Sequence, residues 1–437
     1  MAVRLDRRGF LAAAAGAGLT APLLAAAPTP AEGAPIAAAK LKDTAVFVPG
    51  YLPNEARANG VVLYRNRRMA RDVADSSQPF RLLSRIGMDG SVTQALLPAK
   101  AHDVEVAPGG SVGVLCGFEG RDHVAFDPKT LRMVASEPTL AEGWRGGGHA
   151  FYLAGGKTVI VSERAPYRPA RLGGVEERYG RITIRDADTL KVRGSYSTYG
   201  IDPHDIRLIE NDRYLVAANY GSVPLTQDGK YGVPRQVAEA AITIIDMADG
   251  RLVDKQVTNR RDTEVRHLAA GALDRIFAIQ ARLGDDDADI RLNRGETVAY
   301  GSDITTDGGQ NYMPAPLLKT KSGGKPHVLG NDRQRDGMRH GLSIRYDPVH
   351  DQAIATFPSA HRLMIFDGGS GDVVRDFDTR QSGLKFPCGV TLLPDGKHYA
   401  VTGYWENLYV FERGNHRLNR DLCLYPVFFG HSHITAA

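Results

Sequence analysis

Six histidines and one cysteine recur along the chain at one position of a repeated pattern. Each begins a short apolar run typical of a β-strand, as in His149-Ala-Phe-Tyr-Leu and His204-Asp-Ile-Arg-Leu. Imidazole and thiolate both offer a lone pair to borderline or soft ions, so together these residues could bind a transition metal. The seven residues are His102, His149, His204, His267, His340, Cys388 and His433.

Two simpler explanations compete with a metal site. A single histidine on a strand is usually an ordinary hydrogen-bonding residue, and duplicated repeats can share a residue by descent. Six of the 13 histidines fall at this one position, however, and the single replacement is cysteine, which is itself a metal ligand. Since other positions of the repeat differ freely, the pattern favours metal binding.

The donor set limits the kind of metal. Seven donors exceed the roughly four to six that an ordinary ion accepts, so a subset of them, or a small cluster of ions, is expected. Imidazole and thiolate without an obligatory carboxylate favour iron or copper, and zinc is also compatible. Calcium is disfavoured because it prefers oxygen ligands.

Charged residues flank the predicted ligands. Asp103 and Asp205 directly follow two of the histidines, and strand alternation predicts that their side chains point away from the channel and bond neighbouring strands rather than a metal. Arg266 and Arg339 precede two others, and Arg145 lies near a third. These arginines could attract an anionic ligand, although ordinary loop arginines are the simpler interpretation of each one.

The elements that carry these residues follow a regular plan. Long helical periodicity is almost absent, whereas short runs rich in Val, Ile, Tyr and Phe are separated by Gly, Asp, Asn and Pro, as in antiparallel sheets. Four such runs form one unit from His149 to Tyr196, and four more form the next from His204 to Lys255. This is the plan of β-propeller blades, whose first strands line a central channel, so the seven side chains should converge at one channel mouth.

The unit count predicts an all-β, seven-bladed β-propeller over residues 40–437, although six or eight blades also fit. The polar stretch between Leu283 and Gln310 is predicted to be an inserted surface loop. One blade should join the two ends of the chain, which removes the free sheet edge. Its expected strands are His433–Ala437, Thr44–Val48, Gly60–Tyr64 and the run from Phe80.

The first 30 residues indicate export. Asp6-Arg7-Arg8-Gly9-Phe10-Leu11 is a twin-arginine pattern, and an alanine-rich apolar run to Ala27 follows it. This predicts a twin-arginine signal peptide over residues 1–30, a periplasmic mature protein and no membrane span after the signal. The net charge of +4 is dispersed, which argues against nucleic-acid binding. Cys116 and Cys423 are expected to be core residues without a disulfide between them.

Several phrases resemble the domain-of-unknown-function family numbered 1513. They are Gly148-His149-Ala-Phe, Ser162-Glu-Arg164, Tyr199-Gly-Ile-Asp-Pro-His-Asp205, Leu215-Val-Ala-Ala-Asn-Tyr-Gly221 and Val265-Arg-His-Leu268. The resemblance implies an exported propeller, often encoded beside imelysin-type iron-uptake proteins and di-haem peroxidase-like proteins. It therefore implies iron or redox-metal handling with periplasmic iron-uptake or haem proteins as partners, and it assigns no catalytic residue.

Three functional hypotheses remain. The first is a periplasmic metal-binding protein in iron or copper handling, including a metal-dependent oxidoreductase. The second is a binding module for a protein partner or small anion, in which the histidines only line a wet channel. The third is a hydrolase or lactonase propeller, and it ranks last because such enzymes usually hold calcium through Glu, Asn and Asp, which the seven positions lack.

Overall fold

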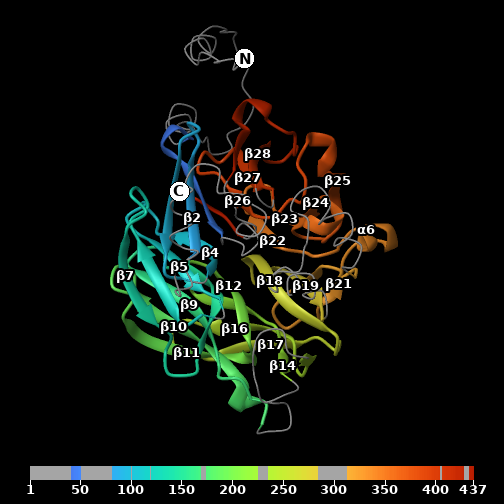
Figure 1. Cartoon of the computed structure of the whole chain (residues 1–437). Coiled ribbons are helices and arrows are strands. Elements are labelled where there is room, and N and C mark those ends of the chain that lie inside the picture. The colour runs from blue at the N-terminus through green and yellow to red at the C-terminus, as the bar shows by residue number, and fades with distance from the viewer. Residues whose placement is uncertain are drawn as a thin grey trace, which may run out of the picture.

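The fold is a seven-bladed β-propeller, seen here in a computed structural model (Figure 1). The structure describes residues 41–50, 81–99, 101–118, 120–168, 174–224, 235–283, 313–403, 406–427 and 433–437. Within them, seven antiparallel sheets of four strands each follow one another in chain order. We number these sheets as blades 1 to 7.

The blades have the following strands, given from the inside outward. Blade 1 contains β30 (Thr435–Ala436), β1 (Ala45–Gly50), β2 (Arg81–Gly87) and β3 (Val92–Leu97). Blade 2 contains β4 (Ala101–Val106), β5 (Gly113–Gly117), β6 (Asp122–Phe126) and β7 (Met133–Pro138). Blade 3 contains β8 (Arg145–Tyr152), β9 (Thr158–Arg164), β10 (Tyr179–Asp186) and β11 (Val192–Ile201). Blade 4 contains β12 (Pro203–Ile209), β13 (Tyr214–Asn219), β16 (Ala241–Asp246) and β17 (Leu252–Val257), with the hairpin β14 (Ser222–Pro224) and β15 (Arg235–Val237) beside it.

The remaining blades repeat the plan. Blade 5 contains β18 (Thr263–Ala272), β19 (Arg275–Arg282), β20 (Leu318–Thr320) and β21 (His327–Val328). Blade 6 contains β22 (Ser343–Asp347), β23 (Gln352–Phe357), β24 (Arg362–Asp367) and β25 (Val373–Asp378). Blade 7 contains β26 (Val390–Leu392), β27 (His398–Thr402), β28 (Glu406–Glu412) and β29 (Leu424–Val427). The described helices are short: α6 (Asp332–Asp336), η2 (Glu176–Arg178), η3 (Pro358–Ala360), η4 (Thr379–Ser382) and η5 (Arg420–Leu422). None of the described helices is long and apolar enough to cross a membrane.

The inner strands form a closed ring. In order, β4, β8, β12, β18, β22, β26 and β30 each contact the next, and β30 contacts β4 again. The core has the same symmetry, because seven clusters of buried apolar residues each combine side chains from two neighbouring blades. Between blades 5 and 6, for example, Phe277 packs in one cluster with Ala353 and Phe366. Burial between sheets therefore holds each blade to both of its neighbours.

Blade 1 closes the ring as the sequence predicts. β30 pairs with β1 through Phe47 opposite Thr435 and Val46 opposite Ala436, and the C-terminus lies beside the blue strands of this blade (Figure 1). Ala45 and Ala437 exchange two backbone hydrogen bonds of 2.8 and 3.0 Å. The predicted strand at Gly60–Tyr64 lies outside the described residues, as does most of the predicted loop at 283–310. The outermost strand of the blade is Val92–Leu97.

The hairpin turns between third and fourth strands share one design. In blades 2 and 3, Oδ1 of Asp127 and of Asp186 accepts hydrogen bonds from backbone N–H groups two and three residues later. Each turn then ends in a left-handed residue, Leu131 and Leu190 at φ 57° in both cases. These Asx turns explain why an aspartate follows the third strand in successive blades.

Candidate metal centre

The strands carrying four of the predicted ligands lose their regular pairing near the histidine. The register between β4 and β5 shifts between Ala101 and Asp103, and that between β12 and β13 shifts between Pro203 and Ile206. β8 and β18 show the same irregularity, between Gly146 and Ala150 and between Val265 and His267. A bulge of this kind bends the strand and redirects its side chains, and bulges are common beside functional sites.

These irregularities change where the predicted ligands sit on their strands. The expectation that all seven residues open the inner strands is wrong, because β8 begins at Arg145 and β18 at Thr263, four residues before their histidines. In blades 6, 7 and 1 the predicted ligand instead lies before the first residue of the inner strand. His340, Cys388 and His433 precede β22, β26 and β30 by two or three residues. The seven residues share a position in the sequence repeat, but they lie at different points relative to the start of their strands.

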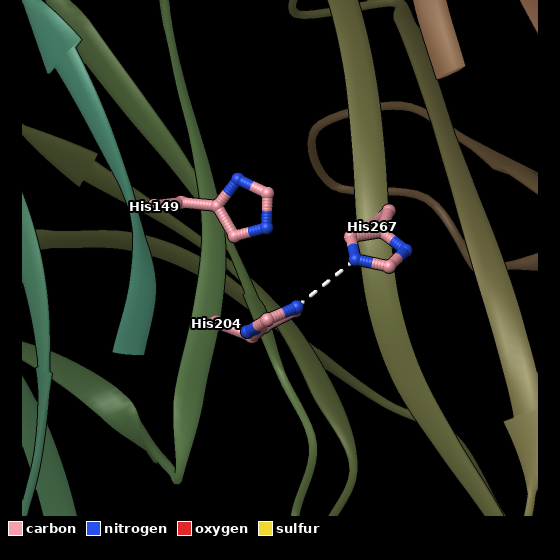
Figure 2. Close-up of side chains that lie close together, drawn as sticks. All are labelled: His149, His204 and His267. Carbon is pink, nitrogen blue, oxygen red and sulfur yellow. Dashed lines mark hydrogen bonds between the residues drawn. The ribbon is translucent and has the colours of Figure 1, made fainter. Parts of the chain in front are cut away.

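Three of the seven residues form a compact group. One side-chain nitrogen each from His149, His204 and His267 can be chosen so that all three lie within 4.8 Å of one another. The three rings come from three neighbouring inner strands, and Nε2 of His204 lies 2.9 Å from Nε2 of His267 (Figure 2). Two nitrogen ligands of a tetrahedral ion, each at about 2.0–2.1 Å, lie roughly 3.3 Å apart. The triad could therefore hold a metal ion if His204 and His267 separated slightly and the more distant nitrogens moved closer.

A fourth predicted ligand joins this group through ring contacts. The centroid of the His433 ring lies 4.4 Å from that of His267 and 4.6 Å from that of His149. Its Nδ1 lies 3.3 Å from Oγ of Ser343 in blade 6. All four rings are buried, at most 3 % exposed. The inner strands of blades 3, 4, 5 and 1 thus converge on one imidazole cluster, which we call the histidine cluster (His149, His204, His267 and His433).

Two of the remaining predicted ligands are placed differently. His340 is half-buried, and its Nδ1 lies 3.1 Å from Oγ of Ser359 in its own blade. Cys388 is buried at the start of blade 7, and neither residue belongs to the metal-binding group found among the described residues. The side chain of His102 lies outside the described part of the chain. Of the six predicted ligands whose side chains are described, the structure therefore brings together four.

Oxygen acceptors orient two of the imidazoles. Nδ1 of His149 lies 2.9 Å from Oδ2 of Asp103 in blade 2 and 3.3 Å from Oδ1 of Asp205 in blade 4. Nδ1 of His204 lies 2.5 Å from the carbonyl oxygen of Gly147. Because a backbone carbonyl oxygen only accepts, the ring proton of His204 belongs on Nδ1, and its Nε2 keeps a lone pair for a metal.

The positions of the two aspartates correct a prediction. Asp103 and Asp205 were expected to point away from the channel and to bond neighbouring strands rather than a metal. Contacts to neighbouring strands are confirmed, but both aspartates contact the predicted ligand His149, because the bulges at Ala101–Asp103 and Pro203–Ile206 break the alternation of side chains. The carboxylate of Asp205 also accepts from Arg207 at 2.5 Å and from the backbone N–H of Leu268 at 2.9 Å. It therefore ties blade 4 to blades 3 and 5.

Charged side chains of the inner strands form a layer next to the histidine cluster. Burial raises the pKa of Asp103 well above its ordinary value, and the nearby Glu105 raises it further. Burial likewise raises the pKa of Asp205 and of Glu105, while Arg207 and Arg345 oppose these shifts. Arg345 lies 3.5 Å from Glu105. The histidine cluster thus adjoins a buried layer in which acidic and basic side chains compensate one another.

Sequence reasoning missed Arg164, which is fully buried beside the cluster. Its Nη2 lies 3.1 Å from Nδ1 of His204, and its guanidinium packs 4.5 Å from the ring centre of Tyr220. Since Nδ1 already donates to Gly147, and arginine can only donate, this contact is one of packing. The same Nη2 can donate to the carbonyl of Gly147, at 3.5 Å. The phrase Ser162-Glu163-Arg164, quoted only as part of the family resemblance, was the available signal.

The three flanking arginines that were considered as anion attractors each contact an acidic residue. Arg145 lies 3.4 Å from Asp202, Arg266 lies 2.9 Å from Glu264, and Arg339 pairs with Asp336. The cysteines expected in the core are buried, with the thiol of Cys116 donating to the carbonyl of His149 at 3.2 Å and that of Cys423 to Asn419 at 3.3 Å. No disulfide joins Cys116 to Cys423.

Comparisons with known proteins bear on the fold and the family. Among solved structures, the chain is similar to one titled "Kuenenia stuttgartiensis Hydrazine Synthase", with a TM-score of 0.52 and 15 % identity over 77 % of this chain and 92 % of that one. At this identity the likeness shows the fold alone. No curated protein matches the chain. The family model described as "Protein of unknown function (DUF1513)" matches residues 95–422, which is most of the chain, so the chain belongs to that family.

Proposed function

We propose that this chain is an exported, periplasmic metal-binding β-propeller that handles iron or copper at the histidine cluster. The observation that carries the proposal is the triad of His149, His204 and His267, whose ligand atoms lie within 4.8 Å of one another in a buried site. Three imidazoles from three blades leave room for a further ligand, as in metal sites that do chemistry. A bound iron or copper ion would supply one-electron redox chemistry there.

The surroundings of the triad support a resident metal. Nδ1 of His149 lies against the carboxyl group of Asp103, and Nδ1 of His204 contacts the carbonyl of Gly147, which leaves Nε2 of each ring to face a metal. Metal-ligating histidines usually donate their second N–H to a carboxylate or carbonyl in this way, which also makes the ligand more basic. In the absence of metal, the Nε2 contact between His204 and His267 requires one proton between them. Metal binding would displace that proton.

The choice among metals follows from the donors. The triad contains nitrogen only, and the nearest carboxylates contact His149 through Nδ1. Nitrogen donors suit iron, copper or zinc, whereas calcium and magnesium require oxygen. The twin-arginine pattern and the genomic setting implied by the family resemblance favour iron or copper, with periplasmic iron-uptake or haem proteins as partners.

The test is metal content by mass spectrometry of protein purified from the periplasm, paired with thermal melts. We expect bound iron or copper in the wild type, and binding that weakens in acid because protons compete for imidazole nitrogen. The double variant His204→Ala/His267→Ala should lose the metal and the gain in melting temperature that added metal gives. The control His327→Ala changes an exposed histidine in blade 5.

The same experiment separates metal binding from the alternative of a metal-free binding module. Equal metal content in the wild type and the double variant would show that the triad is not the site. No metal in any sample, with melts that iron, copper and zinc leave unchanged, would favour the binding module. The control variant guards against a general effect of removing histidines.

A further inference from the structure

A small pocket lies beside blade 3, separate from the histidine cluster, and its lining is strongly basic. Three arginines line it, Arg145, Arg168 and Arg178, against the single carboxylate of Asp202. The empty space at the pocket is about 260 Å³, which includes open solvent at its mouth, so the enclosed part is smaller. The pocket therefore suits only a small molecule. We call it the Arg145 pocket.

Two of the three arginines, Arg145 and Arg178, are held in place by contacts within the fold, whereas Arg168 is exposed. The guanidinium of Arg145 stacks 3.5 Å from the ring centre of Tyr167, and its Nη2 donates to the carbonyl of Ala165 at 3.2 Å. Arg178 is 6 % exposed and donates to the carbonyl of Gly174 at 3.2 Å. Fixed guanidinium groups lose little freedom on binding a carboxylate, and they match its geometry with paired N–H donors.

The remaining wall is mostly apolar. Ile201 and Val223 are nearly fully buried, Ala165, Pro166 and Pro224 also line it, and Ser222 adds a hydroxyl group. An inorganic oxyanion would gain nothing from such a wall, whereas the carbon skeleton of an organic acid would bury against it. We infer that the Arg145 pocket binds a small organic carboxylate, with a carboxylate group on the arginines and its carbon skeleton on the apolar wall.

The pocket is connected to the histidine cluster by a chain of contacts. Oδ1 of Asp202 lies 3.4 Å from Nη2 of Arg145 on the pocket side and 3.4 Å from Nε of Arg164 on the other. Arg164 in turn lies against His204. A carboxylate bound at Arg145 would compete with Asp202 for the guanidinium group. It would thereby alter the contact between Asp202 and Arg164, the arginine that lies against His204. Binding of the carboxylate itself does not require a metal.

Calorimetric titration of metal-stripped, full-length mature protein with succinate tests the inference. We expect saturable binding to one site that weakens at high salt. Arg145→Gln should weaken it at least tenfold, and Arg168→Gln, at a half-exposed position paired with Glu177, should weaken it several-fold. The control Arg193→Gln removes an exposed arginine that pairs with Asp186 outside the pocket and should have no effect.

The outcomes of the succinate titration can be distinguished from those of the metal-binding test. Absence of saturable succinate binding, equal affinity in Arg168→Gln, or tighter binding of inorganic phosphate than of succinate would each overturn the inference. Thermal melts show whether Arg145→Gln folds. If it does not, Arg168→Gln alone tests the pocket. Succinate binding in a protein that never binds metal would refute the proposed function and leave this inference standing.

Discussion

Oδ2 of Asp103 lies 2.9 Å from Nδ1 of His149, although the two residues belong to the inner strands of different blades. Asp205, from the blade on the other side, approaches the same nitrogen at 3.3 Å. The imidazole of His149 therefore lies against carboxyl groups from both neighbouring blades. This arrangement makes the orientation of His149 depend on the closed propeller rather than on its own strand.

Asp103→Asn should weaken metal binding by about 10–100-fold, because a carboxylate that accepts the second N–H orients the imidazole and raises its basicity. The variant should still fold, since burial and Glu105 already raise the pKa of Asp103 and a neutral amide removes a buried charge. Competition with a chromophoric chelator measures the affinity. The matched control Asp249→Asn changes an exposed aspartate. Equal affinity in both variants would show that Asp103 does not support the metal.

Most of the architecture could be predicted from the sequence because propeller blades repeat their chemistry. Apolar runs recur in each unit and Asx turns such as that at Asp186 recur in several, and the closing pair of β30 and β1 follows from the need to leave no free edge. The outer strands of blade 1 were harder to assign. Both Gly60–Tyr64 and Val92–Leu97 are good strand formers, and the described sheet has Arg81–Gly87 third and Val92–Leu97 outermost. Pairing partners decide strand position as much as local sequence does.

The candidate site was less predictable, because its geometry depends on bulges. Strand alternation applied to His102 and Asp103 places them on opposite faces, whereas the register shift beside them turns Asp103 toward His149. Whether a strand bulges depends on tertiary contacts that a single sequence does not display. The shared sequence position also could not show that His340 and Cys388 precede their strands and lie outside the metal-binding triad.

Cys388→Ala should leave metal affinity within about twofold of the wild type, because Cys388 is not part of the group formed by His149, His204 and His267. His267→Ala in the same background should remove most of the binding. Chelator competition, with the absorption spectrum of the copper-loaded protein, measures both effects. A thiolate-to-copper charge-transfer band that disappears in Cys388→Ala would contradict the prediction and restore the cysteine as a ligand.

Glu163→Gln should lower the free energy of unfolding at pH 7 by on the order of 3 kcal/mol. Burial alone would raise the pKa of Glu163, but His123, Arg185 and the backbone N–H of Leu140 outweigh it and lower that pKa to about 2, from an ordinary 4.5. A carboxyl group with a lowered pKa stabilises the fold above its unfolded pKa, and this stabilisation fades as the pH falls from 4.5 toward 2. Urea unfolding at pH 7 and pH 3 measures the difference.

The control for this variant is Glu177→Gln, at an exposed glutamate paired with Arg168. It should change the free energy of unfolding by less than about 1 kcal/mol at either pH, since exposed ion pairs contribute little. A deficit in Glu163→Gln that is as large at pH 3 as at pH 7 would contradict the electrostatic explanation. It would point instead to the lost hydrogen bond from Thr183, which Glu163 accepts at 2.7 Å.

Ile434→Ala should destabilise the propeller by about 2–4 kcal/mol, as expected for truncating a fully buried aliphatic side chain. Ile434 is 0 % exposed and packs with Val46 and Val48 of blade 1 and with Ala400 and Val410 of blade 7, so it seals the junction between the two ends of the chain. Chemical denaturation gives the change, and Val374→Ala, at an exposed position of blade 6, is the matched control. Because His433 precedes Ile434 directly, loosening of the closing strand should also reduce metal affinity. An unfolding free energy equal to that of the control would mean that the ring does not depend on this closure.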